Sequence, residues 1–249
     1  MKSFSTLFHR SFLFVALPAA LAFSSCGDDN PAAPAQGKVL ISHAAASALV
    51  QVTAFVNDQQ VGQLNYGQNS SYLTVNAGSP TFRINNGSQV ITTQALTIEG
   101  NQNYSVFAYS PTAAVGSVAL LSITDDLALP AAGQAKVRLV HLAVGAPSPV
   151  RLTLPSPLPG GAGTDITSDV AFGTASSFVA LNAGAPLNLT ITANGTPRTQ
   201  VLVVGDGTGS GTGTKTFEAG KIYTVVVRGI AGAGVPAAQE AKAVIIQNN

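Results

Sequence analysis

The sequence predicts an all-β protein made of two tandem antiparallel β-sandwich domains. Three observations lead to this prediction. Apolar and polar residues alternate at a period of two, turn dipeptides such as Asn86-Gly87 and Asn194-Gly195 interrupt these runs, and the chain repeats itself. No segment carries a sustained apolar stripe at the helical period. Seven or eight short strands in each copy, separated by close turns, are typical of a sandwich.

Individual strands can be located from their patterns. Leu49–Val56 and Leu187–Gly195 alternate apolar and polar residues, which indicates strands with one buried face. Tyr223–Gly229 and Ala241–Gln247 are instead nearly continuous apolar runs rich in β-branched residues. Such runs are typical of buried strands.

The internal repeat covers nearly the whole chain after the first 37 residues. The matching pairs are Gly37–His43 with Ala135–His141, Asn65–Gly78 with Ala171–Gly184, and Leu96–Ser110 with Lys215–Gly229. The spacing between partners grows along the chain, so the second copy contains insertions. These insertions fall in Pro155–Asp165 and Gly205–Thr214, whose Pro and Gly content indicates lengthened surface loops.

The start of the chain has the layout of a secretory signal. Lys2 and Arg10 are followed by an apolar run over Ser11–Phe23, and two serines then lead to Cys26, the only cysteine. The run is too short to be a membrane span. The small residues before Cys26 resemble a bacterial lipobox, in which the cysteine is acylated and becomes the mature N-terminus. Two or three acyl chains give stable anchoring.

These features together predict the domain organisation. The predicted parts are a lipoprotein signal peptide over 1–25, a flexible tether over 26–37, a first β-sandwich over 38–126, a linker over 127–135 and a second β-sandwich over 136–249. The tether is polar and rich in Pro and Ala, without apolar periodicity.

Charge excludes several classes of partner. Only 9% of residues are charged, and removal of residues 1–25 takes away two of the twelve basic residues and none of the eleven acidic ones. The mature chain therefore has no basic field for nucleic acid and no polybasic patch for lipid head groups. We expect no nucleic-acid partner.

Several of these motifs resemble the domain of unknown function 4397 (DUF4397) family. The resemblance rests on the strand and loop Lys136–Pro147, the Tyr66-Gly67 and Phe172-Gly173 segments, the Asn-Ala-Gly triplets, and Glu218–Val227. It implies a β-sandwich outside the cytoplasm, often in tandem copies, in secreted and surface proteins of bacteria. We therefore expect two sandwiches of an immunoglobulin- or transthyretin-like kind. The family implies no established activity.

The histidines His43 and His141 occupy the same repeat position, at the end of the first strand of each copy. A ligand or general base would need carboxylates, a second histidine or a nucleophile nearby, and the local sequence supplies none. We therefore expect each histidine to hydrogen-bond to the adjacent loop.

Isolated carboxylates give no further site. Glu99 and Glu218 precede a strand in each copy, and a role in orienting the turn is favoured over cation binding because one carboxylate is a poor metal site. Asp125-Asp126 is expected to be a solvated turn. The Gly-rich run with Asp206 lacks the Gly-Lys-Ser/Thr ending of a phosphate loop and reads as a hairpin loop. We expect no catalytic residue, no metal and no cofactor.

Aromatic residues offer only a few candidates for ligand binding. Tyr72/Phe178 and Tyr104/Tyr223 are repeat-equivalent and are interpreted as core. Tyr66, Tyr109 and the long loops of the second copy remain as candidates.

The sequence thus predicts a non-enzymatic, lipid-anchored envelope lipoprotein whose tandem sandwiches bind an unknown protein or glycan. Gly27 stands where the inner-membrane retention signal has Asp, and Asp28-Asp29 resembles the acidic stretch of surface-exported lipoproteins. The expected location is therefore the outer membrane, periplasmic or surface-exposed. The alternatives are an extracellular hydrolase or glycan-binding protein with its site in the long loops of the second domain, or adhesion through exposed edge strands.

The anchor can be tested at Cys26. We expect Cys26→Ala to prevent lipidation, because alanine has no thiol to acylate. Without acyl chains the protein has no stable membrane anchor, so it should leave the membrane fraction. Globomycin should cause the precursor to accumulate. Ser24→Ala, which keeps a small residue before the cysteine, serves as the control. Unchanged processing and fractionation of Cys26→Ala would contradict the anchor.

Overall fold

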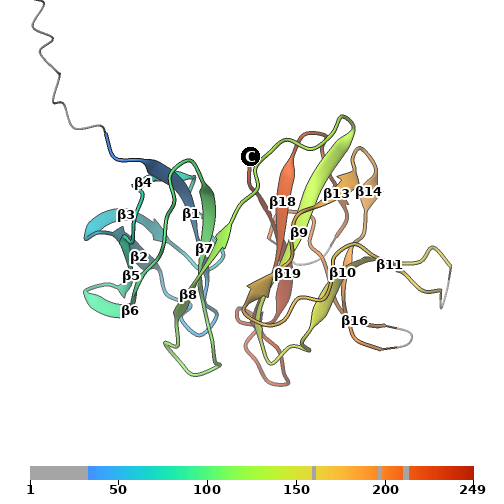
Figure 1. The fold of residues 1–249 in the computed structure, drawn as a ribbon. Coiled ribbons are helices and arrows are strands. Elements are labelled where there is room, and N and C mark those ends of the chain that lie inside the picture. The colour runs from blue at the N-terminus through green and yellow to red at the C-terminus, as the bar shows by residue number, and fades with distance from the viewer. Residues whose placement is uncertain (1–32, 159–160, 196–197, 210–212) are drawn as a thin grey trace, which may run out of the picture. The chain divides into compact units, whose positions relative to one another are not determined.

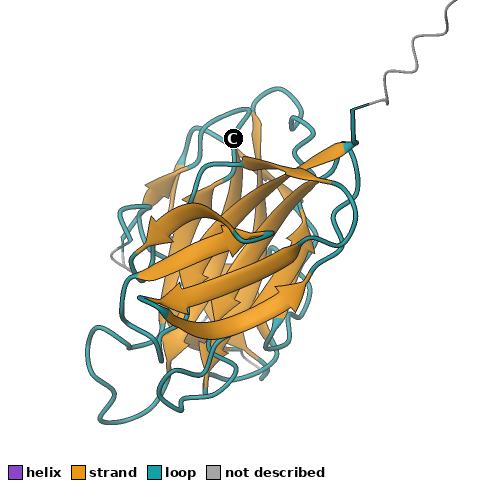
Figure 2. Cartoon of the chain, turned by 90° about the vertical axis from the view of Figure 1, so that its left-hand side faces the viewer, coloured by secondary structure: helices purple, strands orange, loops and turns teal. Residues whose placement is uncertain are grey.

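The computed structural model describes residues 33–158, 161–195, 198–209 and 213–249. In these ranges the chain forms strands, turns and loops, and it contains no helix that could cross a membrane (Figures 1 and 2). The all-β fold class predicted from the sequence is therefore confirmed. The predicted signal peptide, Cys26 and most of the tether lie outside the described residues. Contacts join Pro34–Asn249 into one compact unit.

Residues 36–124 form the first half, which contains eight strands in two sheets. The strands are β1 (Gln36–Ala44), β2 (Val52–Val56), β3 (Gln59–Leu64), β4 (Leu73–Asn76), β5 (Thr81–Asn86), β6 (Gln89–Ala95), β7 (Asn103–Tyr109) and β8 (Ala119–Thr124). One sheet, the inner sheet, has the order β4-β1-β7-β8, and the other, the outer sheet, has the order β3-β2-β5-β6.

Residues 134–247 form the second half, which has the same strand order. Its strands are β9 (Gln134–Val144), β10 (Val150–Leu154), β11 (Thr164–Asp165), β12 (Thr174–Ala175), β13 (Val179–Asn182), β14 (Pro186–Leu187), β15 (Thr190–Ala193), β16 (Thr199–Val203), β17 (Lys215–Thr216), β18 (Ile222–Ile230) and β19 (Lys242–Gln247). The inner sheet has the order β12-β9-β18-β19, with β13 also on β9, and the outer sheet has the order β11-β10-β15-β16. The division into two domains stays a prediction.

Two parallel strand pairs lie at the centre of the inner sheets. β1 pairs with β7 and β9 pairs with β18 in parallel, whereas their other neighbours are antiparallel. These parallel pairs differ from the antiparallel pairing that the sequence predicts. Parallel strands are usually covered on both faces. Five of the seven residues of β7 and seven of the nine of β18 are buried, which explains the continuous apolar runs.

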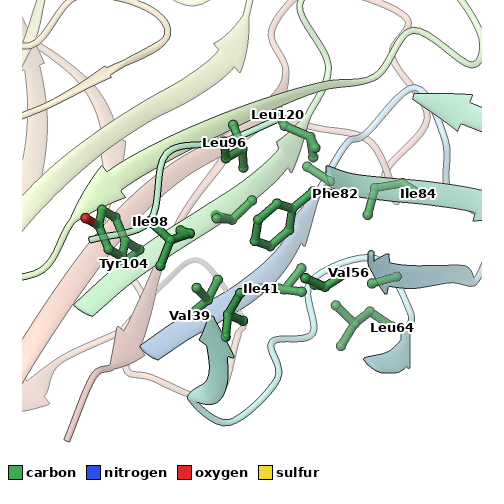
Figure 3. Close-up of a cluster of buried hydrophobic side chains, with 14 of the residues drawn as sticks. Val39, Ile41, Val56, Leu64, Phe82, Ile84, Leu96, Ile98, Tyr104 and Leu120 are labelled. Carbon is green, nitrogen blue, oxygen red and sulfur yellow. The ribbon is translucent and has the colours of Figure 1, made fainter. Parts of the chain in front are cut away.

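Each half has its own apolar core between its outer and inner sheets. In the first half the Phe82 ring from β5 lies among side chains that include Ile41 of β1 and Leu120 of β8 (Figure 3). In the second half Phe217 and Tyr223 meet edge to face within the equivalent cluster. Burying one such side chain contributes roughly 1.5–3 kcal/mol, so these clusters stabilise both sandwiches.

A third apolar cluster joins the two inner sheets. It contains alternate residues of the four central strands and of the edge strand β19, namely Leu40, Ala44, Phe107, Val140, Leu142, Val226, Val244 and Ile246. The intervening residues of the same strands, such as Val137 and Leu139, belong to the core of their own half. Each central strand is therefore buried on one face by its own outer sheet and on the other by the opposite half.

A buried ion pair lies at one end of this interface. Arg138 of β9 donates from Nη2 to Asp125 Oδ1 at 2.5 Å, and both side chains are at most 1% exposed. The other Arg138 nitrogens bond to Thr224 Oγ1 at 3.0 Å and to the Thr124 carbonyl at 3.2 Å, while its Cζ lies 4.5 Å from the Phe178 ring centroid. The expectation of a solvated Asp125-Asp126 turn was thus wrong for Asp125.

The Asp125 carboxylate accepts hydrogen bonds from side chains of both halves. Tyr72 donates to its Oδ2 at 2.5 Å and Ser105 at 2.8 Å, and Asn248 in turn donates to the Tyr72 hydroxyl at 3.2 Å. Burial and the neighbouring Asp125 charge raise the pKa of Tyr72 well above its usual range. This network is complete, which is the condition under which a buried charge is tolerated.

The ion pair generates a stability prediction. Asp125→Ala should lower the free energy of unfolding by about 3–5 kcal/mol, because it leaves the Arg138 charge buried without a partner. Urea denaturation followed by circular dichroism measures the change. Asp126→Ala is the matched control: that carboxylate is 63% exposed and pairs with Lys136, so the loss should stay below about 1 kcal/mol. Equal losses for both variants would refute the assigned role of the pair.

Candidate functional site

The outer sheet of the second half carries a groove of about 690 Å³. Its floor is formed by Thr153 of β10 and by Thr190 and Thr192 of β15, and its walls by the loop residues 155–158 and 161–163. The loop is the first insertion identified in the sequence. It returns close to the end of β10 at Gly163, where a Cβ would lie only 2.7 Å from the Leu154 carbonyl oxygen.

The groove exists because small residues replace large ones. In the first half, the outer face holds the cross-strand pair Phe55 and Arg83, with the guanidinium 4.2 Å from the ring centroid. In the second half the corresponding cross-strand pair is Thr153 and Thr190. The correspondence follows from the neighbouring core pairs, Ala54 with Ile84 and Leu152 with Ile191. Two short side chains thus leave space that the inserted loop encloses.

The floor of the groove is polar and internally hydrogen-bonded. The hydroxyls of Thr153 and Thr192 are 2.7 Å apart, Thr153 donates to Asp165 Oδ1 at 3.3 Å, and Thr190 donates to the Thr153 carbonyl at 3.3 Å. All three threonines are buried. Because each hydroxyl has a partner, their positions are fixed before any ligand arrives, which lowers the ordering cost of binding.

Two arginines and two aspartates form an ionic network that reaches the rim of the groove through Asp165 and Arg198. Arg151 bonds to Asp169 Oδ1 at 2.5 Å and to Asp165 Oδ2 at 2.6 Å, and Arg198 bonds to Asp165 Oδ2 at 3.2 Å. The hydrogen bond from Arg151 lowers the pKa of Asp169, and the bonds to Asp169 and Asp165 raise the pKa of Arg151. The four charges balance, so the rim presents donors and acceptors without a net charge.

The groove offers few groups that titrate. Asp165 is the one acidic side chain among its described lining residues, and it accepts bonds from two guanidinium groups. The described ranges also hold no group of three potential metal ligands among His, Cys, Asp and Glu.

The two histidines lie away from the groove, His43 on β1 and His141 on β9 of the inner sheets. Nε2 of His43 donates to the Val50 carbonyl and Nε2 of His141 to the Pro147 carbonyl, each at 3.1 Å. Both rings are at most 1% exposed. The expectation that each histidine hydrogen-bonds to its adjacent loop is therefore confirmed.

The paired glutamates act through their backbone. The amide of Glu99 donates to the Tyr104 hydroxyl at 3.0 Å, and the amide of Glu218 donates to the Tyr223 hydroxyl at 3.2 Å. Both glutamates are exposed. The turns before β7 and β18 are thus fixed by the tyrosines five residues later.

The remaining sequence candidates are not brought to the groove. Tyr66 lies edge-on to His43, and Tyr109 lies edge-on to Phe172 with centroids 6.0 Å apart. In the Gly-rich run, Asp206 accepts bonds from the Thr208 amide and hydroxyl, and residues 210–212 lie outside the described ranges. Cys26 also lies outside them.

The loop of the groove was predictable from the sequence, whereas its floor and rim were not. The pattern over Leu187–Gly195 predicts Thr190 and Thr192 only as polar positions of an alternating strand, and no local motif marks Thr153. Arg151 and Arg198 were not singled out at all. A comparison of the two copies at Phe55 and Arg83 was the available signal, because it shows large residues replaced by threonine.

Comparisons with known proteins support the family over part of the chain. The family described as domain of unknown function (DUF4397) matches residues 28–149, which include all of the first half, β9 and the loop after it. No curated protein matches this chain. Among solved structures, a "putative cell adhesion protein" from Bacteroides eggerthii is 12% identical. The alignment covers 88% of this chain and 97% of that one, with a TM-score of 0.25.

Histidine burial predicts a loss of stability in mild acid. Desolvation lowers the pKa of both His43 and His141 below the value of 6.5, against the opposing effect of their backbone hydrogen bonds. Below pH 6.5 the unfolded chain therefore binds more protons than the folded one. The free energy of unfolding should fall as the pH falls through this window, with a slope of up to about 1.4 kcal/mol per pH unit for each histidine.

Urea denaturation between pH 5 and pH 7.5 measures this slope. His43→Gln and His141→Gln should each flatten it, because glutamine does not titrate. A slope that is the same in the wild type and in both variants would show that other groups are responsible.

Proposed function

We propose that this chain is a non-enzymatic binding module of the bacterial cell envelope. It is held to the membrane by lipid at Cys26 and presents the groove of the second half to a ligand. The observation that carries the proposal is the asymmetry between the halves. One outer face is filled by Phe55 and Arg83, and the other is hollowed over Thr153 and Thr190 and walled by an inserted loop.

The size and lining of the groove support a ligand site. Ligand clefts usually have volumes of about 300–1,000 Å³, and this groove lies in the middle of that range. Side chains on a sheet face normally fill such a hollow, because the van der Waals contacts that are lost around an open space lower stability. Here the inserted loop encloses the space without filling it.

The chemistry of the groove favours an uncharged ligand rich in hydroxyl groups, such as an oligosaccharide. The threonine hydroxyls, Gln200 and the paired Asp165 and Arg198 place donors and acceptors close together, and their charges cancel. A sugar hydroxyl both donates and accepts, so it can match such an alternating surface. An ionic ligand would find no net charge to attract it.

The anchor and the tandem organisation form the second part of the proposal. The lipobox-like order of small residues before Cys26 supports lipidation, and Gly27 and Asp28-Asp29 support the outer membrane as the location. The shared strand order of the halves supports a second copy of the DUF4397 domain beyond residue 149. A glycan partner outside the cell is consistent with this placement.

A groove-filling variant tests the binding function. Residues 34–249 would be screened against a glycan array, and the glycans that bind would be measured by calorimetry. Thr153→Phe/Thr190→Arg, which copies the first half, should weaken binding at least tenfold because the larger side chains occupy the groove. Circular dichroism and the unfolding temperature check that the variant folds.

The reverse change is the matched control. Phe55→Thr/Arg83→Thr opens the first half instead and should leave glycan binding unchanged. If binding persists in the groove-filled variant, the groove is not the glycan site. If no glycan binds the wild type, the proposed ligand class is wrong.

A further inference from the structure

A second, partly buried arginine lies at the opposite end of the interface from Arg138. Arg228 is at the end of β18, on the interface-facing side that also carries Thr224 and Val226. Its Nε and Nη1 atoms are buried, and neither has a hydrogen-bond partner among the residues that the structure describes. Burial also lowers the pKa of Arg228.

The contrast with Arg138 shows what Arg228 lacks. Both guanidinium groups lie over an aromatic ring, Phe178 for Arg138 and Tyr66 for Arg228, each with Cζ 4.5 Å from the centroid. Arg138 has a buried carboxylate as its partner, and Arg228 has none in the described ranges. Attraction to a ring offsets only part of the cost of burying a charge.

The side chains around Arg228 do not supply the missing negative charge. Burial lowers the pKa of His43 and raises the pKa of Tyr66, so both are neutral near pH 7. Gly67 lies against the guanidinium with a φ of +92°, and a Cβ there would be 2.5 Å from Nη1 and Nη2. The backbone thus approaches as closely as a glycine allows.

A small pocket of about 170 Å³ adjoins this guanidinium. Its polar lining comes from Ser42, Asn69 and Thr208, together with the backbone of three glycines, and none of its described lining residues is acidic. Its apolar side is formed by residues of β18 and β19. The pocket therefore combines a cation with hydroxyl, amide and glycine backbone groups, and its small volume limits the ligand.

We propose that this pocket binds a small oxyanion, either a phosphate or sulfate ion or such a group on a larger molecule. The anion accepts hydrogen bonds from the Arg228 guanidinium, whose fork-like donors suit the oxygens of these groups. The Ser42 hydroxyl and the Asn69 amide supply further donors, whereas the Thr208 hydroxyl already donates to Asp206. Binding would neutralise a buried charge of the interface, and it would thereby stabilise the contact between the halves. This site is separate from the groove, so either proposal can fail alone.

The test uses the purified full-length protein and the probes phosphate, sulfate and chloride at equal ionic strength. Phosphate or sulfate should raise the unfolding temperature above the chloride value and should shift the Arg228 Nε–H resonance, while that of Arg138 stays in place. Arg228→Met keeps the packing of the stem and removes the charge. It should weaken oxyanion binding about tenfold or more.

Arg83→Met is the matched control, because Arg83 also lies over an aromatic ring and the variant loses the same charge. It should bind the oxyanion as the wild type does. Binding of the free ions assigns the site to an ion, and binding only of a phosphorylated or sulfated sugar assigns it to a group on a larger ligand. The absence of any oxyanion-specific effect, or equal binding by Arg228→Met, would overturn the proposal. Should that variant not fold, the resonance shift in the wild type still decides.

Discussion

The central constraint of this fold is that the four middle strands of the inner sheets are buried on both faces. β1, β7, β9 and β18 each contribute alternate residues to the core of their own half and to the cluster between the halves. A polar side chain in this position is costly unless it has a hydrogen-bond partner. This requirement explains the apolar composition of these strands. It also explains why the Arg138–Asp125 pair is surrounded by hydrogen bonds from both halves.

The halves share a strand order but divide the remaining roles between them. The first half is filled on its outer face, and the second half is opened there by threonines and a longer loop. At the interface, equivalent repeat positions hold Leu40 and Arg138, and likewise Tyr109 and Arg228. Each substitution places a cation in one half only. Such differences between two halves of the same strand order produce asymmetric sites without altering either core.

The fold class was predictable from the sequence because strand periodicity and turn dipeptides are local signals. The histidine–loop hydrogen bonds were predictable for the same reason, since His43 and Val50 are near one another in the chain. The parallel pairing of β1 with β7 and the burial of Asp125 were not predictable, because both depend on elements distant in sequence. The groove was predictable only in part. Its loop could be identified as an insertion in the sequence, but its threonine floor forms only when β10 and β15 pair.

The parallel ladder between β1 and β7 also determines how the protein would carry load. In a chain held by lipid at Cys26, any pull from a bound partner enters the folded part at β1. Seven residue pairs, from Lys38 with Asn103 to Ala44 with Tyr109, join β1 to β7. A pull along β1 loads the hydrogen bonds of this ladder together rather than opening them one at a time. The first strand would therefore serve as a mechanical clamp that resists a pull applied along β1.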